Sequence, residues 1–160
     1  LVGEGIARMH ARQASDHLLW AKPMEGARET LDAIPSLGLR QACVSNSDGR
    51  AEEHLVRFGV REGLEFVIDS QHVGIEKPDP RIFALALEKL GIVAGRALYV
   101  GDIRSVDECG SAAAGMPFVL IDPYEDYAAT RTGQIRTIAE LPRYIAETFL
   151  TPASEERRSR

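Results

Sequence analysis

The sequence predicts an α/β protein with a parallel sheet covered by helices on both faces. Four short apolar segments have the length of strands, near residues 39–44, 65–68, 97–100 and 118–121. Segments with helical periodicity lie between them, as expected for β-α-β units. The length of 160 residues suits one domain with a proper core, and 44% apolar with 27% charged residues is ordinary for a globular protein.

Two helices are expected before the first strand. Residues 1–20 carry a loose helical pattern of apolar side chains. A second helix is expected from Met24 to about Ile34, with Leu31 and Ile34 facing inward. Pro35 should end or kink this helix, because proline lacks the N–H that the helix needs. The strand at 39–44 then begins the sheet.

The next helix is expected at residues 50–58, where Leu55, Val56 and Phe58 form its apolar side. The strand at 65–68 follows it. Together these two segments complete the first β-α-β unit of the predicted sheet.

The clearest helix signal lies after Asp79. This residue is a favoured N-cap type, and Pro80 would occupy the first turn, where proline is tolerated. A wide apolar face then continues to Leu90, and Gly91 provides a stop signal.

The C-terminal third repeats the alternation of strands and helices. A strand at 97–100 precedes a helix of small residues through 111–115, and the strand at 118–121 precedes a last helix near 138–149. Residues 151–160 are polar and charged, so this tail is predicted to be disordered.

Composition narrows the classes of partner. The net charge of −5 and pI of about 5.4 argue against general binding of nucleic acid, which needs a basic face. The sequence has neither an apolar stretch long enough for a membrane span nor a signal peptide. Its cysteines, Cys43 and Cys109, form no CxxC pair, which favours a reducing compartment and hence a cytoplasmic protein. Oligomeric state is not indicated.

Candidate functional residues follow the strands, where ligands of parallel sheets bind. Ser45 and Asn46 follow the first strand, and a hydroxyl with free N–H groups at a helix N-terminus can hold an anion. Lys77 lies before a Pro-X-Pro turn that restricts its backbone. Asp102 and Asp107 follow the third strand and could hold a hard cation through oxygen atoms.

Each of these signals also has a simpler interpretation. Ser47 or Asp48 could be an ordinary N-cap, Lys77 a surface lysine, and Asp107 a charge that favours a helix N-terminus. The order of the groups favours function, because a hydroxyl, a lysine and a carboxylate pair converge on one crevice. Phosphoryl transfer needs these parts.

Three motifs carry a resemblance to the haloacid dehalogenase (HAD) superfamily. Residues 42–46 read ACVSN and resemble its second motif, residues 74–83 read GIEKPDPRIF and resemble the third, and residues 99–107 read YVGDIRSVD and resemble the fourth. The resemblance covers about Met24 to Ile121. Its spacing is most similar to the helical-cap branch of phosphoglycolate phosphatase-like enzymes.

This resemblance implies a Rossmann-like three-layer core at residues 21–150. Residues 1–20 would be a remnant of the helical cap returning to this core, and 151–160 the tail. The implied activity is Mg²⁺-dependent phosphatase chemistry on a small phosphorylated metabolite, with no role for nucleic acid or membrane. The substrate itself is chosen by cap residues in this family.

The resemblance also implies a role for each candidate residue. Ser45 would bind a phosphoryl oxygen, aided by the backbone N–H of Asn46. Lys77 would balance negative charge on the phosphoryl group and on the nucleophile. Asp102 would ligate Mg²⁺, and Asp107 would hold the waters of the metal or orient Lys77.

The first motif of the family, a strand ending in Asp-x-Asp, has no match. Asp16 and Asp32 lie in helical contexts, Asp69 is followed by Gln71 at the partner position, and Asp122 follows a strand without a second aspartate. Because the first residue is Leu1 rather than Met, we expect an N-terminally incomplete chain that is inactive alone. A circular permutation that uses Asp122 is the alternative.

The sequence leaves other activities open. A 2-haloacid dehalogenase of the same superfamily shares Ser45-Asn46 and Lys77 but lacks the metal-binding aspartate, so the Gly101-Asp102 pair argues against it. A phosphomutase would differ mainly in its cap. A noncatalytic phosphate-binding protein would have kept the anion site and lost the nucleophile.

Overall fold

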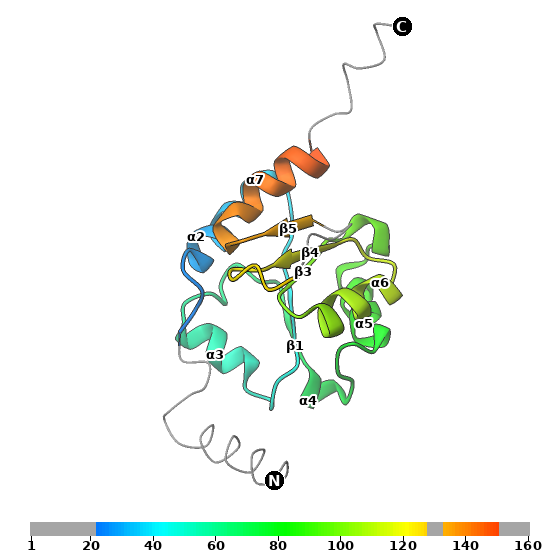
Figure 1. Ribbon diagram of the computed structural model, residues 1–160. Coiled ribbons are helices and arrows are strands. Elements are labelled where there is room, and N and C mark those ends of the chain that lie inside the picture. Colours follow the sequence, from blue (N-terminus) through cyan, green and yellow to red (C-terminus); the bar gives the residue numbers. More distant parts are fainter. Residues whose placement is uncertain (1–21, 128–132, 151–160) are drawn as a thin grey trace, which may run out of the picture.

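A computed structural model describes residues 22–127 and 133–150 (Figure 1). The strands are β1 (Cys43–Ser45), β2 (Val67–Asp69), β3 (Tyr99–Gly101), β4 (Phe118–Ile121) and β5 (Gly133–Ile135). The α-helices are α2 (Ala27–Ala33), α3 (Ala51–Arg57), α4 (Ser70–Val73), α5 (Pro80–Leu90), α6 (Cys109–Ala113) and α7 (Leu141–Ile145). Short 3₁₀ or π segments are η1 (Ile34–Leu37), η2 (Ala94–Arg96), η3 (Arg104–Glu108), η4 (Ile138–Glu140) and η5 (Ala146–Leu150). The helix predicted at 1–20 and the tail at 151–160 lie outside the described residues.

The strands form two parallel sheets instead of the single predicted one. β1 pairs with β2, and a second sheet has the order β3-β4-β5. Within the described ranges, no strand is hydrogen-bonded to the edge of β1 that faces away from β2, or to the edge of β3 that faces away from β4. The Tyr99 hydroxyl instead donates to the carbonyl oxygen of Val44, at 3.2 Å, so a side chain links the two sheets.

Helices cover both faces of the strands, which confirms the α/β class and its three layers. Successive strand residues point to opposite faces, and β3 illustrates this. Val100 packs in a core cluster with Val119, Ile135 and Leu141 on the side of α2 and α7, which lie against each other (Figure 1). Tyr99 packs on the opposite side, where α5 and α6 lie together.

Helix α5 forms as the sequence predicts. The Asp79 carboxylate accepts the N–H of Arg81 at 2.9 Å, and Pro80 is the first helical residue. Ile82 and Phe83 are 0% exposed. Because their cluster also includes side chains of β1, β2 and β3, this one helix packs against both sheets. That shared core holds the two sheets in one domain.

Several local predictions need correction. Val56 is 61% exposed, because the face of α3 that turns inward carries Ala51 and Leu55, one helical turn apart. Strand β5 has no sequence signal, since Ile135 is its one apolar residue. The helix expected from Met24 begins at Ala27. The last predicted helix is not one regular α-helix, because it consists of the three consecutive segments η4, α7 and η5.

None of the helices in residues 22–127 and 133–150 has the length and apolarity of a membrane span.

Candidate functional site

The central group of the candidate site is the ammonium of Lys77. Its Nζ donates to Asp107 Oδ1 at 2.8 Å and to the Tyr99 hydroxyl at 3.0 Å. The side chains of Lys77 and Asp107 are 12% and 4% exposed. Burial lowers the pKa of Lys77, but Tyr99 and Asp107 outweigh it and raise this pKa above the usual value. Lys77 is therefore a cation at neutral pH.

Asp107 divides its two carboxylate oxygens between two segments. Oδ1 binds Lys77, while Oδ2 accepts the backbone N–H groups of Asp102 at 3.2 Å and Ile103 at 3.0 Å. The turn after β3 is thus fixed to the lysine. Of the two roles expected for Asp107, orientation of Lys77 is the one that its contacts match.

Gly101 makes this arrangement possible. A Cβ atom at this position would lie 2.5 Å from Asp107 Oδ2, closer than real contacts allow. Gly101→Ala should therefore displace the buried carboxylate and lower the free energy of unfolding by about 1–3 kcal/mol, measured by chemical denaturation. Gly95→Ala is the control, because no heavy atom lies within 4 Å there. Equal stabilities of the two variants would contradict the prediction.

Asn46 fixes the backbone of Lys77. Its Oδ1 accepts the Lys77 N–H at 2.8 Å, and its Nδ2 donates to the Lys77 carbonyl at 2.9 Å. Such a reciprocal pair holds the two segments in one register. The sequence predicted a role for the backbone N–H of Asn46; the structure adds this role for its side chain.

Ser45 lies at the end of β1, between two residues that contact this cluster. Val44 accepts the Tyr99 hydroxyl, and Asn46 binds the Lys77 backbone. The Ser45 hydroxyl is half-buried and makes no hydrogen bond to another described residue. It is free to bind a ligand.

Asp69 organises the loop after β1, and sequence reasoning missed it. The residue is 4% exposed. Its carboxylate accepts the backbone N–H groups of Gly49 at 3.1 Å, Ala51 at 3.0 Å and Gln71 at 3.0 Å. A carboxylate directly after a strand is a visible signal, but in the sequence it suggests only a possible nucleophile.

The structure therefore connects four of the predicted residues: Asn46, Lys77, Asp102 and Asp107. Lys77 contacts Asn46 and Asp107 directly, and Asp107 holds the backbone of Asp102. Ser45 is the last residue of β1 and directly precedes Asn46 in the chain. In the sequence Tyr99 is only one residue of an apolar strand, because no pattern of spacing shows where a hydroxyl will point.

Asp102 is the residue that fits a cation. Its side chain is exposed and makes no hydrogen bond or ion pair to another residue of the described ranges. Across those ranges no group of three or more His, Cys, Asp or Glu side chains could hold a metal. One free carboxylate suits Mg²⁺, which keeps several waters and takes one or two carboxylates together with substrate phosphate.

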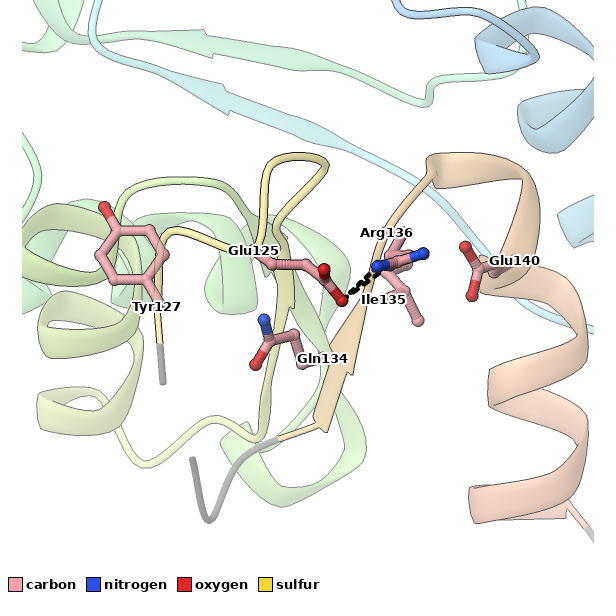
Figure 2. Close-up of a pocket in the computed structure, with 6 residues that line it drawn as sticks. All are labelled: Glu125, Tyr127, Gln134, Ile135, Arg136 and Glu140. Atoms are coloured by element: carbon pink, nitrogen blue, oxygen red, sulfur yellow. Dashed lines mark hydrogen bonds and ion pairs between the residues drawn. The ribbon is translucent and has the colours of Figure 1, made fainter. Parts of the chain in front are cut away.

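A separate cavity of about 330 Å³ lies on the side of β5 (Figure 2). It is lined by Glu125, Tyr127, Gln134, Ile135, Arg136 and Glu140. The Nε of Arg136 donates to Glu125 Oε1 at 3.0 Å across it. None of the predicted site residues lines this cavity.

Comparison with known proteins agrees with this geometry. The family model of haloacid dehalogenase-like hydrolases matches residues 5–121. The chain belongs to this family. A haloacid dehalogenase-like hydrolase domain-containing protein 3 from Mus musculus is 44% identical over 98 residues, covering 61% of this chain and 39% of that protein. A glyceraldehyde 3-phosphate phosphatase from Methanopyrus kandleri is 33% identical over 103 residues, covering 64% of this chain and 44% of that protein.

Solved structures of the HAD family share the fold. A 2-haloacid dehalogenase from Pseudomonas syringae matches with a TM-score of 0.65 and 27% identity, over 77% of this chain and 53% of that one. The chain spans less than half the length of the two curated relatives above, at 39% and 44%. The chain thus has the fold of its family, and proteins named as phosphatases are among its relatives.

Proposed function

We propose that this chain is the phosphate-binding and metal-binding part of a Mg²⁺-dependent phosphatase that acts on a small phosphorylated metabolite. The observation that carries the proposal is the buried Lys77 cation, which is fixed by Asp107 and Tyr99. Asn46, the residue after Ser45, binds the backbone of this lysine. A preorganised cation suits a phosphoryl group.

Each residue has a defined task in this proposal. Ser45 and the backbone N–H of Asn46 bind phosphoryl oxygens, and Lys77 balances the negative charge. Asp107 holds Lys77 in place. Asp102 would hold Mg²⁺, which when bound supplies further positive charge toward the phosphoryl oxygens. We place this work in the cytoplasm, without nucleic acid or membrane as partners.

The attacking carboxylate, which would form an aspartyl-phosphate, comes in this proposal from a part of the protein outside the printed sequence. The sequence contains no Asp-x-Asp at a strand end, and Asp69 is fully used by backbone N–H groups. The 160-residue chain alone should then release no phosphate. Hydrolysis of p-nitrophenyl phosphate by this chain, lost in Asp102→Asn, would contradict this and favour a permuted nucleophile.

Asp102 gives the test that separates a phosphatase from a dehalogenase. In a form of the protein that carries the upstream residues, Asp102→Asn should weaken Mg²⁺ binding and lower kcat at least about 10-fold, because Mg²⁺ depends on few carboxylates. The assay compares a phosphomonoester with 2-chloropropionate, each with and without EDTA. Asp48→Asn, another exposed aspartate, is the control. Chloride release that resists EDTA would overturn the phosphatase proposal; phosphate binding without turnover would favour a noncatalytic protein.

A further inference from the structure

Tyr99 combines a buried ring with a hydroxyl that reaches the candidate site. The ring packs edge-on against Phe83 at 4.8 Å between centroids and stacks near Phe118 at 6.4 Å. At its other end the hydroxyl lies 3.0 Å from Lys77 Nζ and 3.2 Å from the Val44 carbonyl oxygen. The packed ring leaves the hydroxyl little freedom to move.

The direction of these hydrogen bonds follows from chemistry. An ammonium only donates, so the Tyr99 oxygen accepts from Lys77. The one phenolic proton then goes to the Val44 carbonyl, which can only accept. The phenol must be neutral for this, and burial, as the largest cause, raises the pKa of Tyr99 to about 12. The hydrogen bonds thus lead from Lys77 through the Tyr99 hydroxyl to Val44 in β1, the residue before Ser45.

We propose that Tyr99 is a positioning residue that fixes the direction of the Lys77 ammonium, an inference that rests on the phosphatase function proposed above. An ammonium has three N–H groups. One goes to Asp107 and one to Tyr99, which leaves a single N–H to meet a phosphoryl oxygen. Without the hydroxyl, the ammonium could rotate about its bond to Asp107, and the preorganisation that stabilises developing charge would be reduced.

The kinetic test is Tyr99→Phe in the phosphate-hydrolysing form of the protein. This change keeps the ring between Phe83 and Phe118 and removes only the oxygen. We expect kcat to fall roughly 10-fold, as for one hydrogen bond to a charged group, with KM changed less than about twofold because ground-state binding is kept. Tyr124→Phe, where the residue is 83% exposed, is the control and should leave both constants unchanged.

A double variant tells positioning from simple packing. If Tyr99 acts through Lys77, Tyr99→Phe should cause no further loss of kcat in a Lys77→Met background. Additive losses in the two variants would overturn the inference, because they would mean that Tyr99 acts through another group.

A second measurement does not depend on activity. Lysine ammonium groups are followed by NMR in protein labelled with ¹⁵N-lysine, and the Lys77 signal is the one lost in Lys77→Met. Tyr99→Phe should lower the pKa of Lys77 and speed its proton exchange, while the signals of Lys22 and Lys89 stay in place. An unchanged Lys77 signal overturns the inference.

This measurement also separates the two proposals. A shifted Lys77 signal in a protein that hydrolyses no phosphomonoester in any form would overturn the phosphatase function and support the positioning contact. Should Tyr99→Phe fail to fold, 3-fluorotyrosine at position 99 replaces it, because its oxygen is present but accepts more weakly. The Lys77 signal should again shift, and an unchanged signal again overturns the inference.

Discussion

Lys77→Met is expected to lower the free energy of unfolding by about 3–5 kcal/mol, the usual cost of removing one partner from a buried ion pair. The reason is that the Asp107 carboxylate, 4% exposed, would lose its cation while remaining out of water. In the hydrolytic form of the protein, kcat should also fall by about 100-fold or more, because a preorganised charge is lost. Urea denaturation and steady-state kinetics measure the two effects.

A double variant distinguishes the loss of stability from the loss of kcat. Lys77→Met combined with Asp107→Asn removes both charges, and the amide oxygen can still accept the N–H groups of the turn after β3. Much of the lost stability should return while kcat stays low. Lys22→Met, on an exposed lysine, should change stability by less than about 0.5 kcal/mol. Recovery of kcat in the double variant would contradict the role of Lys77.

Asp69→Ala is expected to destabilise the protein by about 3 kcal/mol, because three backbone N–H groups lose their acceptor. The largest part of this destabilisation should come from the backbone N–H of Ala51. This residue is 6% exposed, so water cannot replace the carboxylate there. The loop that follows Ser45 should lose order with it. Thermal or urea unfolding measures the stability, and proteolysis within residues 46–50 reports on the loop.

Two further variants serve as references for Asp69. Asp69→Asn keeps the size and one oxygen, so it should cost about half as much as Asp69→Ala. Asp32→Ala removes an aspartate with 67% side-chain exposure, whose ion pair with Arg28 is long at 3.9 Å, and should be nearly neutral. A neutral Asp69→Ala would mean that the loop does not depend on this residue.

The sequence was a good guide where local signals agree with one another. Helix α5 carries a cap, a first-turn proline, an apolar face and a terminal glycine, and all of them act as predicted. The positions of Lys77 and Asp107 were predicted because ligands gather at the carboxyl ends of parallel strands. The contact between these two residues, at 2.8 Å, agrees with that principle.

Features that depend on three-dimensional packing could not be predicted. Strand β5 has a single apolar residue and exists because Ile135 completes a core cluster. The side chain of Asn46 and the hydroxyl of Tyr99 act across elements far apart in the sequence, on Lys77 and Val44. No periodicity records such pairings.

The shared carboxylate of Asp107 has a thermodynamic consequence. One of its oxygens holds the cation Lys77, and the other holds the turn that carries Asp102. An anion that binds the ammonium and a metal that binds the turn would therefore both affect the Asp107 carboxylate. Linkage requires that each ligand changes the affinity of the other by the same factor. If the metal changes the affinity for the anion by some factor in a titration, the anion must change the affinity for the metal by the same factor in the reverse titration.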